Sequence, residues 1–375
     1  MEIREYLSVM VDKDASDVYL TVGLPPMYRI QGTIHPVGND ELTREGLAIL
    51  CQSIMDERQK KMFADTREMN LALGYEDLGR FRVNIFQQRG SPGLVIRQIK
   101  FEILNAEQLN LPSILNDIVM SKRGLILVVG ATGCGKSSTL AAMIDHRNST
   151  SAGHIISIED PVEFLHTHKQ CVITQREVGY DTVSFQAALK NTLRQAPDVI
   201  LIGEIRDAET MEAAIAFSET GHLCLATLHS NNAAQAIERV MNFFDEERHR
   251  QIYLQLSLNL RAILSQRLIK TTSGTRLPAV EILLDTPRIK DMIRKGQVEM
   301  LKEAMEQGEQ EGCQVFDTAV FNLYISGQID IDAALANADS ANNLRLRIQA
   351  ADLKRGKGEE KKPRFRIRSD VASHR

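Results

Sequence analysis

A glycine-rich segment near the middle of this 375-residue chain restricts its possible folds more than any other feature. Residues 130–137 read Gly-Ala-Thr-Gly-Cys-Gly-Lys-Ser, which matches the pattern G-x-x-x-x-G-K-[ST] at every position. An apolar run at 125–129 precedes the segment, and a helical pattern at 138–146 follows it. A strand, a phosphate-binding loop and a helix in this order predict a P-loop nucleotide-binding domain.

The residue types of this segment suit the binding of ATP with Mg²⁺. The glycines let the backbone curl so that N–H groups point at phosphate oxygens, and the start of the helix adds partial positive charge. Lys136 would place a cation on the β- and γ-phosphates, and the Ser137 hydroxyl would ligate Mg²⁺. Cys134 is interpreted as a small tolerated residue rather than as a redox switch. The predicted nucleotide-binding residues are Gly130, Ala131, Thr132, Gly133, Cys134, Gly135, Lys136, Ser137 and Ser138.

Short continuous apolar runs, each followed by a helical pattern, surround the P-loop. Such runs are typical of strands that are buried on both faces of a parallel sheet. They lie at 125–129, 155–158, 199–202 and 223–227. Beyond residue 286 the apolar spacing is helical, at 287–294, 297–307, 314–325 and 339–350. We therefore predict an α/β core with a parallel sheet, followed by a C-terminal helical region.

The first hundred residues have the pattern of a small α+β unit. Strand-like segments lie at 18–22, 28–30, 80–86 and 94–99, and the last two are joined by a predicted turn at 90–93. Apolar residues between 43 and 62 have helical spacing. The predicted division is an N-terminal domain at 1–104, a linker at 105–112, an ATPase core at 113–285, a helical region at 286–350 and a tail at 351–375.

Composition and charge favour a cytosolic protein with a distinct tail. The five cysteines form no C-x-x-C pair, which favours a reducing compartment and argues against structural zinc. No stretch approaches the roughly 18 uninterrupted apolar residues of a membrane span, so any membrane contact would be peripheral. Residues 351–375 hold nine Lys/Arg against four Asp/Glu, although the whole chain has a net charge of −4. This tail either contacts an anionic or membrane-adjacent partner or is a solvated, disordered end, and its lack of apolar periodicity favours the second interpretation.

Acidic residues follow two of the predicted strands. One apolar strand leads to Glu204, whose carboxylate would approach the Mg²⁺ in the role that aspartate fills more commonly in P-loop proteins. The segment 158–163 carries Glu159, Asp160 and Glu163. Hydrolysis needs a base or a positioning group within hydrogen-bond reach of the attacking water. Asp160 or Glu159 could instead cap the turn that follows.

Histidines and arginines supply two further groups of candidates. His222 and His229 bracket one predicted strand, and we interpret them as sensors of the γ-phosphate, with a structural role as the alternative for either one. Four arginines cluster in the N-terminal unit: Arg80, Arg82, Arg89 and Arg97. An arginine that reached the ATP of a neighbouring subunit would stabilise the transferring phosphoryl group and would require a ring. A solvated edge strand is the alternative for any single arginine of the four.

These motifs, in this order, resemble those of the secretion ATPases of type IV pili and type II secretion, and within them the retraction branch of PilT and PilU. The likeness covers roughly residues 1–345. It rests on the segments ASDVYLTVGLPPMYRIQG, GATGCGKS, IEDPVEF, LIGEIRD and TGHLCLATLH. The resemblance implies a PAS-like N-terminal domain, a RecA-like ATPase domain and a hexameric ring.

The resemblance also implies roles for particular residues. Glu163 would be the catalytic glutamate and Glu204 the Walker B acid, which approaches Mg²⁺ through water. His222 and His229 would form the histidine box. The N-terminal arginines that would approach the nucleotide are Arg82 and Arg97.

A pilus motor of this kind would work in the cytoplasm, on the inner membrane at the pilus base. It would turn ATP hydrolysis into rotation of the inner-membrane platform protein and so pull pilin subunits out of the fibre. PilT-like chains carry an AIRNLIRE segment, of which residues 288–295 keep only part, and they generally lack a basic tail. Both departures resemble the accessory PilU type, which acts beside a PilT-like ATPase; a PilT-type primary motor is the alternative.

Three other classes are less consistent with the sequence. Pilus extension and type II secretion ATPases normally bring a longer N-terminal region and a four-cysteine zinc insert, and this chain has neither. A nucleic-acid motor is disfavoured by the acidic body, by 5% aromatic residues and by the lack of tryptophan, which leave little for base stacking. We therefore expect no specific nucleic-acid partner. A regulatory scaffold that binds ATP without turnover is disfavoured by the intact carboxylates.

Overall fold

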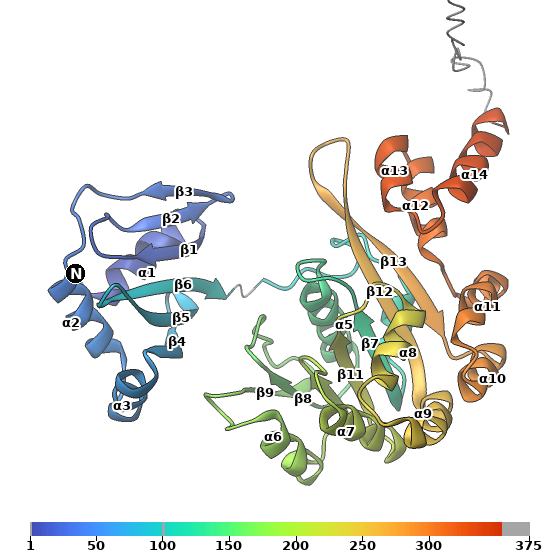
Figure 1. The fold of residues 1–375 in the computed structure, drawn as a ribbon, viewed down its shortest axis with the longest axis horizontal. Coiled ribbons are helices and arrows are strands. Elements are labelled where there is room, and N and C mark those ends of the chain that lie inside the picture. The colour runs from blue at the N-terminus through green and yellow to red at the C-terminus, as the bar shows by residue number, and fades with distance from the viewer. Residues whose placement is uncertain (1, 100–101, 355–375) are drawn as a thin grey trace, which may run out of the picture.

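The computed structural model describes residues 2–99 and 102–354, which form two α/β units (Figure 1). The N-terminal unit has a six-stranded antiparallel sheet with the strand order β3-β2-β1-β6-β5-β4. Its elements are α1 (Ile3–Asp12), β1 (Ala15–Leu20), β2 (Met27–Ile30), β3 (Thr33–Pro36), α2 (Arg44–Ile54), α3 (Glu57–Thr66), β4 (Glu68–Tyr75), β5 (Gly79–Gln88) and β6 (Ser91–Ile99). The buried faces of α1, α2 and the sheet share one hydrophobic core.

The alternating pattern predicted for residues 80–86 is confirmed in β5. Phe81, Val83 and Ile85 are fully buried, whereas the residues between them are partly exposed. Since successive side chains of a strand point to opposite faces, the apolar set faces the helices and the core. The same alternation leaves Arg80 and Arg82 on the other face of the sheet, where they are available to the second unit.

The turn predicted at 90–93 was wrong by one residue at its start and by three at its end. The chain reverses at Arg89 and Gly90, whose φ angles of 48° and 75° suit a two-residue hairpin turn of type I′. Residues 91–93 already pair with β5. Pro92 lies at the start of β6, beyond the stretch that pairs with β1, so its missing N–H interrupts no ladder on that side.

The helical spacing between residues 43 and 62 belongs to two helices rather than one. The Asp56 carboxylate accepts a hydrogen bond of 2.7 Å from the backbone N–H of Gln59 and so caps the start of α3. The chain therefore ends α2 at Ile54 and begins a new helix at Glu57, three residues later.

The second unit contains a seven-stranded sheet with the order β13-β12-β7-β11-β10-β8-β9. All neighbouring strands from β12 to β9 are parallel, and only β13 is antiparallel to its neighbour. The elements are α4 (Ile114–Val119), β7 (Gly124–Val129), α5 (Lys136–Thr150), β8 (Gly153–Glu159), β9 (Cys171–Glu177), α6 (Phe185–Thr192), the 3₁₀ turn η1 (Leu193–Gln195), β10 (Val199–Ile202), α7 (Ala208–Glu219), β11 (Leu223–Leu228), α8 (Ala233–Met241), α9 (Glu246–Asn259), β12 (Leu260–Lys270) and β13 (Arg276–Leu284).

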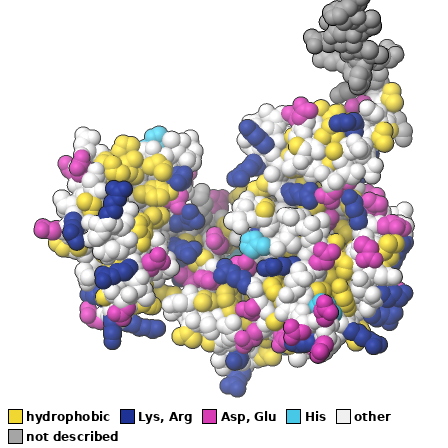
Figure 2. All heavy atoms as spheres, viewed as in Figure 1, with side chains coloured by type: hydrophobic (Ala, Val, Ile, Leu, Met, Phe, Trp, Pro, Cys, Tyr) yellow, Lys and Arg dark blue, Asp and Glu magenta, His cyan; other side chains and the backbone are white. Residues whose placement is uncertain are grey.

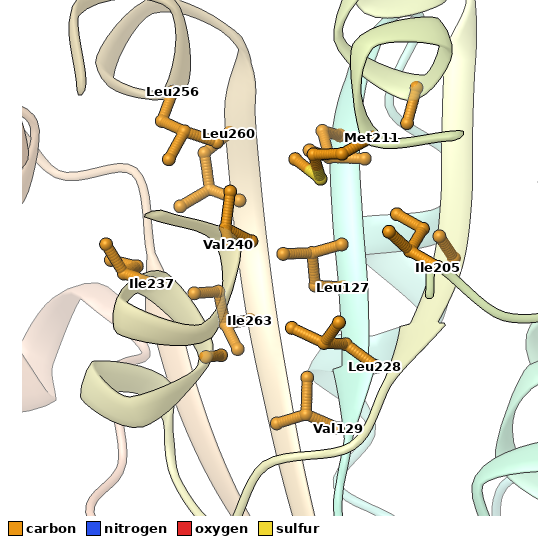
Figure 3. Close-up of a cluster of buried hydrophobic side chains, with 14 of the residues drawn as sticks. Leu127, Val129, Ile205, Met211, Leu228, Ile237, Val240, Leu256, Leu260 and Ile263 are labelled. Carbon is orange, nitrogen blue, oxygen red and sulfur yellow. The ribbon is translucent and has the colours of Figure 1, made fainter. Parts of the chain in front are cut away.

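Two hydrophobic cores cover the two faces of this sheet. Leu127 and Val129 of β7 point into the core beneath α7, α8 and α9, whereas Ile126 and Val128 point into the core beneath α4 and α5. Figure 3 shows the first of these cores, in which Leu228 and Ile263 from the neighbouring strands pack with Leu127 and Val129. The four predicted strands at 125–129, 155–158, 199–202 and 223–227 are confirmed, because each is buried on both faces.

Three strands of this sheet were not predicted, namely β9, β12 and β13. The β12–β13 hairpin carries polar side chains within its buried stretches, among them Ser265, Gln266 and Glu281. These residues interrupt the continuous apolar run that marks a buried strand. The hairpin projects past the edge of the sheet toward α12 and α13 (Figure 1).

The C-terminal region is helical, as predicted. It consists of α10 (Pro287–Lys295), η2 (Val298–Met300), α11 (Leu301–Gln307), η3 (Glu309–Glu311), α12 (Phe316–Ile325), α13 (Ile331–Asn337) and α14 (Ala341–Lys354). Helices α12 to α14 share a small core with residues of the β12–β13 hairpin. Helix α14 continues past the expected boundary at residue 350, and the rest of the predicted basic tail, residues 355–375, lies outside the described residues.

The predicted fold class is confirmed: a small α+β domain precedes a RecA-like P-loop domain with a C-terminal helical region. The domain boundaries given above stay predictions. Within residues 2–99 and 102–354, no helix combines the length and the apolar character that crossing a membrane requires.

Candidate nucleotide-binding site

The P-loop joins the end of β7 to the start of α5 and has a backbone that only glycine can supply. Gly130, Gly133 and Gly135 have φ angles of 151°, 78° and 92°. A Cβ atom on Gly130 would lie 2.5 Å from the sulfur of Cys134 and 2.6 Å from the carbonyl oxygen of Gln266. Gly130 and Gly135 are therefore required both by backbone conformation and by close packing, and Gly133 by backbone conformation alone.

Gln266 of β12 supports this loop from beneath. Its amide nitrogen donates to the Cys134 carbonyl at 2.8 Å, and its amide oxygen accepts from the Thr139 hydroxyl at 2.6 Å. Gln266 and Thr139 are both buried. Gln266 was not predicted from the sequence, because only the sheet order brings β12 beside β7. Its one signal was a polar residue within a largely apolar segment.

Cys134 lies inside the loop and is buried. Burial raises the pKa of its thiol, although the nearby Lys136 opposes the shift. A protonated, buried thiol is a poor nucleophile. These properties agree with the interpretation of Cys134 as a small packing residue.

The P-loop faces a pocket of about 150 Å³ at the carboxyl ends of the parallel strands. In open α/β sheets, ligands bind in the crevice outside these strand ends. The polar residues that line it are Lys136, Ser137, Glu159, Asp160, Glu163, His166, Glu204, Thr227 and His229. The structure thus brings together four of the predicted groups: the P-loop lysine and serine, the acidic segment, the Walker B glutamate and one histidine. Ser138 instead lines a neighbouring hollow beside the 108–111 segment.

Lys136 and Glu204 both line this pocket, and both make short polar contacts. The Lys136 ammonium donates to the carbonyl oxygens of Gly130 at 2.8 Å and Ala131 at 3.1 Å, so it curls back over the loop. The Glu204 carboxylate receives the Arg206 guanidinium at 2.7 Å and the His229 Nε2 at 3.0 Å. Glu204 therefore has both a guanidinium and an imidazole as direct partners.

The acidic segment after β8 presents carboxylates of different character. Glu159 is partly buried, and burial raises the pKa of its carboxyl, while the Gln175 amide, which donates to its Oε1 at 3.4 Å, opposes the shift. Glu163 lines the same pocket and is exposed to solvent. Asp160 lies 3.7 Å from the Arg206 guanidinium. The turn capping considered for Asp160 or Glu159 thus does not remove either of them from the pocket lining.

His166 is a pocket residue that the sequence analysis did not single out. Burial lowers the pKa of its imidazole to about 4, so the ring is neutral at physiological pH. Its Nδ1 is buried and has no hydrogen-bond partner in the described part of the chain. A single histidine in a loop has no sequence pattern that would predict its position in the pocket lining.

The structure separates the two predicted histidines. His229 follows the end of β11, where Leu228 pairs with Val129 at the entry to the P-loop. His222 precedes the start of β11, where its carbonyl oxygen accepts from the Gly124 N–H at 3.0 Å. The two ends of one strand lie on opposite edges of the sheet, so the expectation that both histidines lie beside one site is corrected: within one chain only His229 does.

The predicted arginines also differ in their surroundings. Arg82 lines a hollow of about 510 Å³ between the two units, together with Asp160 and Tyr180. Figure 2 shows acidic and basic side chains along the boundary between the units. Arg97, directly opposite Arg82 on β6, pairs with Asp17 at 2.8 Å. Neither arginine lines the P-loop pocket of its own chain in the described residues.

Arg80 makes a direct contact between the two units. The sequence had given Arg80 only as one of four candidate arginines. Its guanidinium lies 3.5 Å from the Glu177 carboxylate and 5.8 Å from the centre of the Tyr180 ring. Glu177 also accepts a hydrogen bond from the Val162 N–H at 3.2 Å, within the acidic segment. Arg80 therefore connects the N-terminal sheet to the loop that carries the pocket carboxylates.

The donor set at the P-loop fits Mg²⁺ bound in the manner of a nucleotide site. The described residues contain no group of three or more His, Cys, Asp or Glu arranged to hold a metal by themselves. Mg²⁺ in phosphate-transfer sites is held by one or two protein ligands together with substrate phosphates and water. Ser137 and Glu204, which line one pocket, match that requirement.

Comparisons with known proteins agree with this geometry. The family described as "Type II/IV secretion system protein" matches residues 2–345. The chain belongs to this family. It is 51% identical to the type IV pilus ATPase PilU of Pseudomonas aeruginosa, over 93% of this chain and 92% of that protein. It is 39% identical to the type IV pilus retraction ATPase PilT of the same organism, over 92% of this chain and 100% of that protein.

A solved structure gives the same answer for the fold. The crystal structure of the pilus retraction motor PilT with bound ADP is similar with a TM-score of 0.86 and 36% sequence identity, over 92% of this chain and 99% of that one. The predicted membership of the pilus retraction ATPases is therefore confirmed. The roles of individual residues stay predictions.

Proposed function

We propose that this chain hydrolyses ATP to ADP and phosphate and uses the free energy to retract type IV pili as a homo-hexamer. The observation that carries the proposal is the pocket where Lys136, Ser137, Glu163, Glu204 and His229 converge at the carboxyl ends of the strands. The retraction ATPases to which the chain is similar support the coupling to pili.

Binding of the nucleotide would begin at the P-loop. Its backbone N–H groups and the start of α5 would hold the phosphates, and Lys136 would turn from the Gly130 and Ala131 carbonyls toward them. Ser137, with Glu204 through water, would hold Mg²⁺. When bound, the ion neutralises charge that develops on the phosphate oxygens.

Hydrolysis would depend on the acidic segment. We assign Glu163 to accept the proton of the attacking water, because it lines the pocket and is exposed to it. Glu159 is a competing candidate, since its raised pKa suits a base. His229 Nε2, 3.0 Å from Glu204, would respond to the γ-phosphate. His222 lies at the other end of β11 and is not among the described residues that line this pocket, so we propose no such role for it within one chain.

The partners follow from the family and are also proposals. The motor would act on an inner-membrane pilus platform protein, from the cytoplasmic side at the pilus base. Higher identity to PilU than to PilT, 51% against 39%, favours the accessory type that works beside a PilT-like ATPase. The second candidate is a PilT-type primary motor. PilT, like PilU, aligns with nearly the whole chain, so the coverage does not separate the two types.

Substitutions in the pocket test the hydrolytic assignment. Lys136→Ala should abolish turnover, because it removes the cation that stabilises the phosphoryl charge. Glu163→Gln should keep ATP binding and lower kcat by about 10²-fold or more, because it removes the proton acceptor. Steady-state phosphate release and equilibrium binding of a fluorescent ATP analogue measure the two properties separately.

Glu159→Gln is the matched control, since it makes the same chemical change in the same pocket. If Glu159→Gln alone stops hydrolysis while Glu163→Gln turns over normally, the base is Glu159 and our assignment of Glu163 is wrong. If wild type shows no nucleotide binding, the proposed function itself fails.

A further inference from the structure

The loop that follows His229 is held by two side chains of the β12–β13 hairpin. The Glu281 carboxylate accepts the N–H of Ala233, the first residue of α8, at 2.7 Å and the Ser265 hydroxyl at 3.0 Å. Arg267 donates to the carbonyl oxygen of Asn231 at 3.4 Å. The Glu281 carboxylate and the Arg267 guanidinium therefore both hold the short segment between His229 and α8.

The same guanidinium also holds the C-terminal helices. It donates to the carbonyl oxygen of Asn337 at 3.0 Å and pairs with Asp339 at 2.8 Å, at the end of α13. It stacks on the ring of Phe316, 3.8 Å from the ring centre. Phe316 begins α12 and is fully buried in the core of the C-terminal helices. Figure 1 shows these helices packed beside the hairpin.

The charges around Arg267 favour a fixed position. Asp339 and Glu281 are the acids that face it, and Lys302 lies 3.7 Å from the other side of Asp339. Lys302 also lies 3.4 Å from Asp317, whose carboxylate accepts the Asp339 N–H at 2.7 Å. The donors of a planar guanidinium point in fixed directions. Arg267 can therefore keep its contacts with the Asn231 and Asn337 carbonyls and the Asp339 carboxylate only in one orientation.

We propose that Arg267 is a positioning residue that couples the His229 loop at the nucleotide pocket to the C-terminal helices α12–α14. This inference rests on the proposed nucleotide site. Because one rigid group contacts both sides, a shift of the loop must move the contacts at Asn337 and Asp339 or break them. The C-terminal helices would thus respond to the nucleotide without touching it.

A fluorescent probe on α13 tests the coupling. All five cysteines of the chain are buried, so Ala336→Cys, at an exposed position of α13, can be labelled selectively. A non-hydrolysable ATP analogue with Mg²⁺ should change the probe signal in the otherwise wild-type protein. Arg267→Lys keeps the positive charge but loses the fork and the stacking on Phe316. It should reduce the change by about fivefold or more, with analogue affinity within about twofold of wild type.

Arg345→Lys is the matched control, because Arg345 is an exposed residue of α14 and the chemical change is the same. It should behave as wild type. Asp339→Asn removes the ion pair from the opposite side and should also reduce the change, so it decides the matter if Arg267→Lys fails to fold by circular dichroism. A kcat that falls with an unchanged KM in both variants would distinguish coupling from lost binding.

Two results would overturn the inference and can be told apart. A full probe response in both Arg267→Lys and Asp339→Asn, or none in the wild-type background despite analogue binding, shows that Arg267 does not couple the two regions. Absence of analogue binding in the wild-type background instead overturns the proposed function, and the inference falls with it.

Discussion

Gln266 illustrates how single residues outside the motif shape the nucleotide site. The motif residues Lys136 and Ser137 face the pocket, but the loop that presents them is held through the Cys134 carbonyl and the Thr139 hydroxyl, both bonded to Gln266. Close packing of the Gln266 backbone against Gly130 adds a steric requirement for glycine. The geometry of the phosphate site is therefore set jointly by the P-loop and by a strand that is distant in the sequence.

Gln266→Leu should lower the free energy of unfolding by about 1–3 kcal/mol, because it leaves a buried carbonyl and a buried hydroxyl without partners. ATP-analogue binding should weaken at the same time, since the loop loses its support. Urea unfolding and analogue titration measure the two effects. Gln349→Leu, at an exposed position of α14, is the control and should change neither. An unaltered affinity in Gln266→Leu would contradict the supporting role.

Much of the residue-level site could be predicted from the sequence, and the exceptions have a common cause. Glu204 and His229 follow closely after apolar strands, and Lys136 belongs to the P-loop motif that begins at the end of a third strand, so the pattern of strands brings all three to one edge. His166 belongs to a loop without a local signal, and loop packing brings it to the pocket. Gln266 shows in the sequence only as a polar residue within an apolar segment, and the sheet order brings it beside the P-loop. His222 was misplaced because sequence proximity to a strand does not say which end of the strand faces the site.

The β12–β13 hairpin is the element that connects the nucleotide core to the helices after it. It pairs with β7, supports the P-loop through Gln266, holds the start of α8 through Glu281 and shares a core with α12–α14. The parallel strands could be predicted from continuous apolar runs, whereas this hairpin could not, because its polar residues serve contacts that exist only in the folded chain.

Glu281 should make stability depend on pH. Burial raises the pKa of its carboxyl to about 7, with Asp339 adding to the shift and the Ala233 N–H, Ser265 and Arg267 opposing it. Because the folded-state pKa lies above the unfolded value, the folded state holds the proton more tightly. The contribution of Glu281 to the free energy of unfolding is therefore fully present below about pH 4.5 and is lost as the pH rises to about 7. The total loss is roughly 3 kcal/mol.

Glu281→Gln should flatten that part of the pH profile. The measurement is the urea midpoint between pH 4.5 and 8 for wild type and variant, expressed as a difference so that other titrating groups cancel. Glu309→Gln, at an exposed position of η3, provides the baseline. A difference curve that stays flat across this range would show that Glu281 does not titrate there.

At the scale of the whole molecule, the N-terminal unit lies against the acidic segment of the nucleotide core. Arg80 pairs with Glu177, and Arg82 faces a hollow that Asp160 also lines. Arg97 is paired with Asp17 on its own sheet. In the described part of the chain none of these arginines lines the P-loop pocket, so we expect any action of Arg82 or Arg97 on ATP to occur at the pocket of another subunit.

Arg82→Ala should lower turnover of the assembled ring by up to about 10³-fold, because an arginine supplied in trans stabilises charge in the transition state. The affinity of the isolated monomer for nucleotide should stay nearly unchanged. Arg89→Ala, at the tip of the β5–β6 turn, is the matched control. Equal losses of monomer affinity and ring turnover in Arg82→Ala would contradict an action across subunits, and Arg97→Ala can be tested in the same way.

The central claim is that hydrolysis belongs to an assembled ring and depends on Glu163. The most direct measurement is steady-state ATPase activity against particle mass, determined by light scattering with nucleotide, for wild type and Glu163→Gln. We predict turnover that appears with a six-subunit particle and disappears in the variant, although the variant still assembles and binds ATP. Full activity in a monomer that does not respond to loss of Glu163 would contradict the account.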